Sequence, residues 1–282
     1  MSRRAVPTLY RPDSTVPTLR KPRYSQSLEF GLAILRCFSP QHPVLGIFDI
    51  ADQLGMGRST THRYVITLVA LGYLEQGASR KYRLGIRPTD LGIASLNSAY
   101  IRDPARPHLE KLHRSTRYSV GLGVLDRTHV VYIDHLCSQR YSQEPDGPKV
   151  RAGVRVPACC TSIGKLLLAF LPQDERESVL AENDHARRTK HVITKKRLRE
   201  QLAEIPILGY AISDEEFYPG VRSLAVPVRD DTSVVAAVNL SVYQAALSVQ
   251  DLLDFYPLVG ATAEKVSRIL GYESGENGNR GE

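Results

Sequence analysis

The sequence predicts an α+β protein in which an N-terminal winged helix-turn-helix is joined by a helical linker to a C-terminal α+β domain with an antiparallel sheet. Three observations support this prediction. The 282 residues, 42% of them apolar, suffice for two hydrophobic cores. Helical spacing dominates the first third of the chain, and hairpins with interposed helices follow it. Charge divides at the same place: residues 1–102 hold 14 Lys and Arg against 6 Asp and Glu, a net +8, whereas the rest sums to −1.

This charge distribution predicts that the cationic residues 1–102 bind a polyanion and that the near-neutral remainder of the chain has another role. Residues 1–23 carry four prolines and six basic residues against one acid, without any apolar period. They are predicted to form a flexible basic arm. Two interpretations stay open for this arm: a solvated tail, or a non-specific contact with phosphates or an A·T-rich minor groove.

The winged helix-turn-helix is predicted over residues 24–88. A first helix covers residues 24–39, a second covers 47–55, and a third covers 58–71 after a short turn. Gly55 suits the end of the second helix because glycine readily adopts the left-handed conformation found there. The residues expected on the buried faces of these helices are Leu28, Leu32, Ile34, Leu35, Phe38, Ile47, Ile50, Ala51, Leu54, Thr61, Val65 and Leu68.

Two short strands, 73–76 and 81–84, flank a turn and complete the wing. The linker helix is predicted over residues 89–102. Asp103 then opens and caps a further helix that reaches Thr116. These elements would connect the wing to the second domain.

The C-terminal domain is predicted over residues 103–272, followed by a disordered tail at 273–282. Hairpins with helices between them are typical of an antiparallel sheet covered by helices. The expected strands are 119–125, 129–135, 211–214, 223–228 and 234–241. The expected helices are 161–170, 173–181, 195–205 and 248–270, and residues 137–149 are expected to be a loop.

The third helix of the first domain is predicted to enter the major groove of double-stranded DNA, because a helix fits that groove. Its outward residues can bond base edges or phosphates, and the basic wing tip can hold flanking phosphates. The expected DNA-binding residues are Arg58, Ser59, Thr60, Arg63, Tyr64, Thr67, Arg80 and Lys81. His62 is expected to be packed against the protein. The alternative is a helical adaptor domain that uses the wing for protein contacts.

Several classes of protein are disfavoured by the sequence. No apolar run is long enough to cross a bilayer, and no secretion signal follows Arg3 and Arg4, so a cytoplasmic protein without membrane contact is expected. The four cysteines show no zinc-finger spacing, and we expect no metal and no cofactor. An enzyme is not expected, because neither G-x-S-x-G nor H-E-x-x-H occurs.

The DNA-binding region resembles that of the IclR family of bacterial transcriptional regulators. The resemblance is carried by residues 49–73, D-I-A-D-Q-L-G-M-G-R-S-T-T-H-R-Y-V-I-T-L-V-A-L-G-Y, and by the following L-E-Q-G-A-S-R-K-Y-R-L-G. Two later stretches resemble the family's effector-domain signatures: G-V-R-V-P-A-C-C-T-S-I-G-K-L-L-L at 153–168 and G-Y-A-I-S-D-E-E-F-Y-P-G-V-R-S-L-A-V-P-V at 209–228. The resemblance implies a GAF-like effector-binding domain, and homodimers that often pair into tetramers.

A pocket for a small organic acid is predicted in the second domain. The helix that opens at Thr161 directs backbone N–H groups and its dipole at an incoming carboxylate, although an ordinary capped helix has the same pattern. Alternation places Asn239 and Ser241 on one strand face, and the resemblance implies that these positions, together with Ser213 or Asp214 and with Ser223, contribute to the cavity. The expected effector-binding residues are Cys159, Thr161, Ser162, Ile163, Ser213, Asp214, Ser223, Asn239 and Ser241.

The segment V-P-A-C-C-T-S departs from the family, which commonly carries a histidine and a small residue where Cys159 and Cys160 stand. It resembles the branch that senses β-ketoadipate-pathway and related aromatic acids. The function predicted is therefore a transcriptional regulator whose operator binding responds to a carboxylate or aromatic acid. The alternatives are a DNA-binding protein with a ligand-free structural or oligomerisation domain, and a small-molecule hydrolase.

Overall fold

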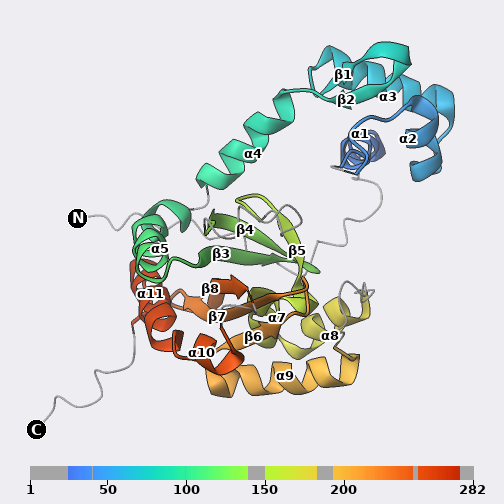
Figure 1. The fold of residues 1–282 in the computed structure, drawn as a ribbon. Helices are drawn as coiled ribbons and strands as arrows, with labels where there is room; N and C mark the ends of the chain where they lie inside the picture. Colours follow the sequence, from blue (N-terminus) through green and yellow to red (C-terminus); the bar gives the residue numbers. More distant parts are fainter. Residues whose placement is uncertain are drawn as a thin grey trace, which may run out of the picture. The chain divides into compact units, whose positions relative to one another are not determined.

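The computed structural model describes residues 25–39, 41–98, 100–138, 150–182, 193–243 and 247–273. The predicted arm, most of the predicted loop at 137–149 and nearly all of the predicted tail lie outside these residues. The chain divides into two compact units between Ser95 and Leu96. Each unit is described by itself below (Figure 1).

The first unit has the predicted order of helices and strands. It contains α1 (Gln26–Arg36), α2 (Ile47–Leu54), α3 (Arg58–Ala70), β1 (Leu74–Gln76) and β2 (Tyr82–Leu84). Gly55 ends α2 with a φ of 61°, as the sequence predicts. The core is formed by Ile34, Phe38, Leu45, Ile50, Val65, Leu68, Leu74 and Tyr82. Leu45 also bridges to Tyr82, so the segment before α2 extends the wing hairpin.

Helix α1 differs from its prediction in two ways. It begins at Gln26 because the hydroxyl of Ser25 caps it by accepting from the N–H of Leu28. Leu28 and Leu32 were expected to be buried, but they are 63% and 48% exposed. Their face of α1 has no counterpart in the core of this unit, which is formed around Ile34 instead.

Helix α4 (Arg87–Ser98) follows the wing. Helix α5 (Arg102–Thr116) comes next in the chain and packs in the second unit. The prediction that Asp103 caps α5 was wrong. Ile101 occupies the N-cap position, and Asp103 lies in the first turn, where its charge favours the positive end of the helix dipole.

The second unit is a six-stranded antiparallel sheet in the order β5-β4-β3-β8-β7-β6, an α+β architecture as predicted. Its helices cover both faces (Figure 1): α5, α10 and α11 pack on one, and α7, α8 and α9 on the other. The strands are β3 (Ser119–Asp126), β4 (His129–Leu136), β5 (Arg155–Pro157), β6 (Ala211–Asp214), β7 (Val221–Arg229) and β8 (Val234–Tyr243). The helices are α7 (Ser162–Ala169), α8 (Gln173–Glu182), α9 (Lys195–Leu208), α10 (Val249–Leu253) and α11 (Tyr256–Ile269).

Two elements of this unit differ from the sequence prediction. The helix expected over 248–270 is broken into α10 and α11, because Pro257 lies at the start of α11 and cannot continue a preceding helix. Strand β5 was not predicted, because three residues are too few to show alternation. It lies at the sheet edge beside β4.

Candidate DNA-binding surface and effector site

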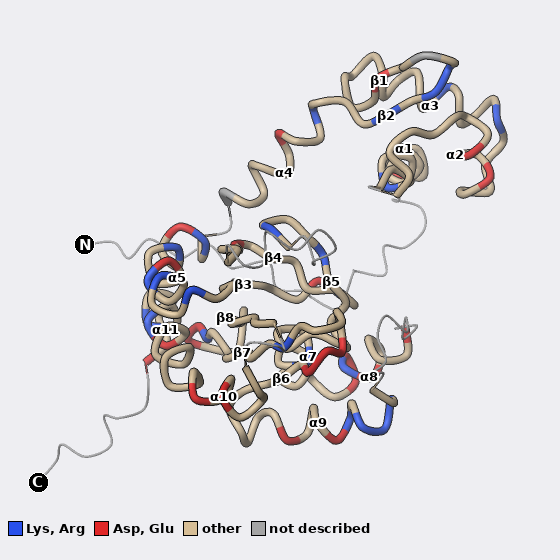
Figure 2. The backbone as a smooth tube through the Cα atoms, in the orientation of Figure 1, with Lys and Arg blue, Asp and Glu red and all other residues tan. Residues whose placement is uncertain are grey.

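Helix α3 presents one polar face to solvent. Thr61, Val65 and Leu68 are buried at helical spacing, which leaves Arg58, Ser59, Arg63 and Thr67 exposed and Thr60 half-buried. The guanidinium of Arg58 lies over the Phe48 ring, 3.7 Å from its centroid, which holds this cation at the start of the helix. The Arg63 side chain makes no hydrogen bond or ion pair with another described residue. Figure 2 shows basic residues in blue along α3 and beside β2.

Two residues of α3 do not lie as expected. Tyr64 was expected to face outwards, but it is half-buried, and its ring meets Phe30 of α1 edge-on at 6.0 Å. It therefore braces α3 against α1. His62 was expected to be packed, but it is exposed.

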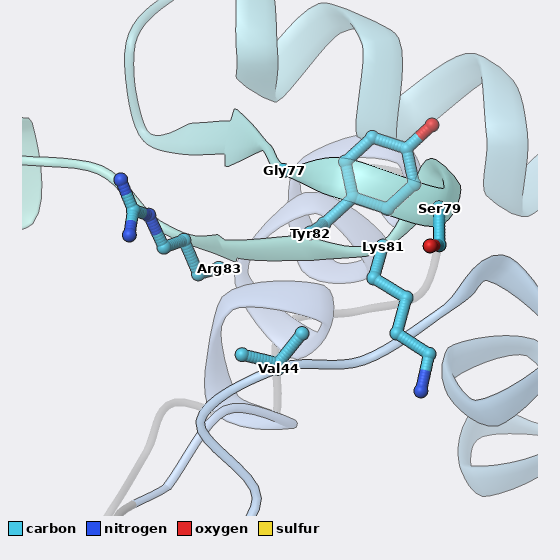
Figure 3. Close-up of a pocket in the computed structure, with 6 residues that line it drawn as sticks. All are labelled: Val44, Gly77, Ser79, Lys81, Tyr82 and Arg83. Atoms are coloured by element: carbon cyan, nitrogen blue, oxygen red, sulfur yellow. The ribbon is translucent and has the colours of Figure 1, made fainter.

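The wing carries a hollow of about 360 Å³ lined by Val44, Gly77, Ser79, Lys81, Tyr82 and Arg83. In Figure 3, Val44 lies between the side chains of Lys81 and Arg83, and their charged ends point in opposite directions. The Arg83 guanidinium is engaged by Glu75 across the hairpin at 2.8 Å. Ser79 and Arg80 take left-handed φ values of 61° and 55°, which form a tight tip. Arg83 is thus engaged within the wing, whereas Arg80 and Lys81 are exposed at its tip, where a ligand could contact them.

A row of serines crosses the sheet of the second unit. Strand pairing places Ser213 opposite Ser223, Ser223 opposite Ser241, and Ser241 opposite Ser119. Directly opposed residues point to the same sheet face with Cβ atoms about 5 Å apart. Four hydroxyls from four adjacent strands thus lie in line on the face that α7 covers.

The N-terminus of α7 is joined to this row. Ser162 donates to the hydroxyl of Ser223 at 2.8 Å, and Ser213 donates to the carbonyl of Cys160 at 2.9 Å. Thr161 caps α7 by accepting from the N–H of Gly164 at 3.2 Å. Gly164 is required here, because a Cβ would overlap the backbone of Ala158. The structure therefore brings together Thr161, Ser162, Ser213 and Ser223.

Three of the predicted effector residues lie elsewhere. Ile163 is fully buried in the core, and Cys159 is 8% exposed within the same cluster. Asp214 follows Ser213 and so points to the other face of the sheet, where it pairs with Arg222 at 2.6 Å. All four cysteines lie in the described residues, and none of them forms a disulfide.

Asn239 forms the next row of the same face. Its side-chain amide donates to the hydroxyl of Ser241 at 2.9 Å, while its carbonyl oxygen, Oδ1, is buried without a hydrogen-bond partner among the described residues. Its neighbour on β3 is Gly121, and the neighbour of Gly121 on β4 is His135. The ring of Tyr132 meets that of His135 edge-on at 5.4 Å.

Sequence reasoning missed Gly121, Tyr132 and His135. Burial lowers the pKa of His135 to about 4, with a smaller raising by Asp134 and a lowering by His113. Burial also raises the pKa of Tyr132, against a hydrogen bond to Asn239 that lowers it. Both rings are thus uncharged near pH 7. The strand register places His135 opposite Gly121, and the Tyr132 ring reaches Gly121 although its own register partner is Gly123.

A buried ion pair joins α7 to the turn that follows β6. Lys165 was predicted only as part of a helix, yet its side chain is 1% exposed and pairs with Glu216, which is 7% exposed. Burial lowers the pKa of Lys165 and raises that of Glu216, and the attraction between the two opposes both shifts. No group of three or more metal-ligating side chains occurs among the described residues.

The comparisons with known proteins decide the family. Residues 93–268 match the domain described as "Bacterial transcriptional regulator IclR C-terminal", and residues 27–78 match the "IclR helix-turn-helix domain". The chain belongs to the IclR family of bacterial transcriptional regulators. The resemblance found in the sequence and the predicted α+β fold are therefore confirmed.

Individual relatives agree with this assignment. The transcriptional regulator XynR of Escherichia coli K12 is 34% identical, over 88% of this chain and 98% of its own. The structure of an IclR family regulator from Brucella abortus is 29% identical with a TM-score of 0.77, covering 88% of this chain and 93% of that one. An IclR homolog from Microbacterium hydrocarbonoxydans, complexed with 4-hydroxybenzoate, is 26% identical with a TM-score of 0.71, covering 86% and 98%.

These relatives are regulators of transcription, which supports the regulator prediction over a hydrolase. Within the described residues, no helix is both long enough and apolar enough to span a membrane. The IclR family thus accounts for both units: a helix-turn-helix in the first and the IclR C-terminal domain in the second.

Proposed function

We propose that this IclR-family chain binds a DNA operator and that a small organic acid modulates the binding. In this proposal residues 24–88 bind DNA, residues 89–102 link the two parts, and residues 103–272 bind the acid. The observation that carries the proposal is the serine row beneath the N-terminus of α7. This row is a buried polar face inside the IclR C-terminal domain, which is separate from the helix-turn-helix domain.

Operator recognition is assigned to the exposed face of α3. Arg63 is the strongest candidate for base recognition, because its guanidinium is not engaged by any other described residue and can bond guanine bidentately. Ser59, Thr60 and Thr67 flank it, and Arg58 is held over Phe48 at the helix start. Arg80 and Lys81 at the wing would contact phosphates, which makes affinity salt-dependent. Tyr64 would act by bracing the helix.

A carboxylate suits the proposed effector site. Ser223 and Ser241 lie opposite each other, and both hydroxyl oxygens already accept a hydrogen bond, from Ser162 and from Asn239. Each hydroxyl hydrogen is thus available for a ligand oxygen. The 4-hydroxybenzoate complex of the Microbacterium relative supports an aromatic acid. Aromatic acids are therefore the class to test first.

A homodimer is the proposed assembly, with pairing into tetramers as a further step. The first unit and α4 expose several large apolar side chains, which a partner copy would cover. These side chains include Leu28, Leu32, Leu71, Ile86, Leu91 and Ile93. Two-fold symmetric operators would follow from such a dimer.

The test is a gel-shift assay with the full chain and the DNA that flanks its own gene, with and without a panel of small carboxylates and aromatic acids. We expect a sequence-specific shift whose midpoint moves with at least one acid. A specific shift that no acid moves would favour the alternative of a ligand-free oligomerisation domain. The absence of any sequence preference at moderate salt would overturn the proposal.

A further inference from the structure

Helix α3 carries one large apolar side chain that the core of the first unit does not take up. Val65 and Leu68 belong to that core, and Tyr64 and Val69 pack against it. Ile66 is in neither group, and it is 45% exposed. A single exposed apolar residue is ordinary on a protein surface, so the face of the helix on which it lies decides what it can do.

Ile66 lies on the face of α3 that is assigned to operator recognition. At about 100° per residue, it is about 60° around the helix axis from Arg63 and about 20° from Ser59. All three residues are exposed, and they follow one another at the i, i+4, i+7 spacing typical of helices that read the major groove. Leu71, one of the apolar residues assigned to a dimer partner, lies about 140° away from Ile66 around the same axis and so faces elsewhere.

The chemistry of the major groove limits what an isoleucine can contact there. All four bases present hydrogen-bonding groups to this groove, and thymine adds an apolar methyl group. An isoleucine against a polar base edge would remove water from it without offering a hydrogen bond in return, which is unfavourable. Against the methyl group of thymine, the same side chain removes apolar surface from water on both partners. The side chain of Ile66 therefore favours thymine at the position that it reaches.

We propose that Ile66 contacts the methyl group of a thymine in the operator and so selects an A·T pair at that position. This inference rests on the proposed binding of an operator and makes it more specific. Cβ atoms three residues apart on a helix are about 5 to 6 Å apart, and stacked bases are about 3.4 Å apart. The thymine is thus expected within about two base pairs of the guanine assigned to Arg63.

The experiment replaces single thymines of the operator by deoxyuridine, which lacks only the methyl group. Selection from random DNA with the full chain supplies the site, and fluorescence anisotropy measures the affinity for each substituted duplex. Within about two base pairs of the guanine whose contribution Arg63→Ala removes, deoxyuridine at one thymine of each half-site should weaken binding about three- to fivefold, the value of one buried methyl group.

The variant Ile66→Ala tests whether this side chain carries the effect. Alanine keeps the helix, because it is the best helix former, and it removes the apolar contact. The variant should bind the thymine operator about three- to fivefold more weakly than the wild type and should no longer distinguish thymine from deoxyuridine. Ile86→Ala removes an isoleucine that is 71% exposed outside α3, and as the matched control it should keep the wild-type preference for thymine.

Two results would overturn the inference and leave operator binding standing. In the first, no thymine near that guanine responds to the loss of its methyl group. In the second, the preference for thymine persists in Ile66→Ala because both duplexes are weakened equally, as the loss of a dimer contact would produce. If the full chain selects no sequence from random DNA, operator binding and the inference both fall.

Discussion

Nζ of Lys165 lies 2.7 Å from Oε1 of Glu216 and 3.0 Å from Oε1 of Gln201, with the lysine side chain 1% exposed. This cluster joins α7 to α9 and to the turn after β6. Lys165 belongs to the same helix whose N-terminus meets the serine row. The position of α7, and with it the geometry of the proposed site, therefore depends on a buried charge.

Replacing Lys165 by Met should destabilise the second unit strongly. The change leaves Glu216 buried without its counter-charge, which costs about 3 to 5 kcal/mol. The double variant Lys165→Met, Glu216→Leu should recover most of that loss, since apolar side chains of similar volume often replace a buried pair without cost. Urea unfolding followed by circular dichroism measures both. A double variant no more stable than the single one would show that the loss does not come from leaving the Glu216 charge uncompensated.

Stability should fall in weak acid because of His135. Its pKa of about 4 in the folded chain lies below the usual value of about 6.5, so the unfolded chain takes up a proton first. The contribution is complete above pH 6.5 and is lost progressively down to pH 4, up to about 3 kcal/mol. Denaturation at a series of pH values should show a shallower acid loss for His135→Gln than for the wild type. His62→Gln, at an exposed histidine, is the control and should follow the wild type.

Arg63→Ala should weaken binding to the cognate operator more than binding to random DNA. Loss of a bidentate base contact costs about 1 to 3 kcal/mol, or roughly 5- to 150-fold in affinity. Fluorescence anisotropy with both DNAs measures the ratio. Arg83→Ala is the matched control, because Glu75 already engages that guanidinium. Equal losses on both DNAs for Arg63→Ala would reduce Arg63 to a phosphate contact.

Ser241→Leu should abolish the response to acid while leaving operator affinity near normal. The leucine fills the space beside Ser223 and removes a donor from the proposed carboxylate site. Gel shifts with increasing acid give the dose response, and Ser233→Leu, in the exposed turn between β7 and β8, serves as control. An unchanged dose response in Ser241→Leu would move the effector site elsewhere.

Much of the fold was predictable because its signals are local. The glycine that ends α2, the apolar spacing of α3 and the alternation in β8 each lie within a dozen residues. The broken helix after residue 248 depended on Pro257, whose position at a helix start was not recognised. The exposure of Leu28 and Leu32 could not be predicted, because an apolar face directed at the core and one left outside it have the same spacing.

The site was predictable only in part, for a different reason. Ser162, Ser213, Ser223 and Ser241 were identified from local patterns and from the family resemblance. His135 and Gly121 belong to the same face only through the pairing of β4, β3 and β8, which no local pattern encodes. Asp214 was included because the family resemblance implied either Ser213 or Asp214, yet strand alternation places Asp214 on the other face, beside Arg222.

The pairing of β3 with β8 also sets an order of events during synthesis. Ser119 meets Ser241, so the middle of the sheet cannot close until the ribosome has released a chain of more than 241 residues. The helix-turn-helix, whose described core residues and strand pairs all lie within the first 84 residues, can fold much earlier. Newly made chains would thus complete the helix-turn-helix before the sheet of the second unit has formed.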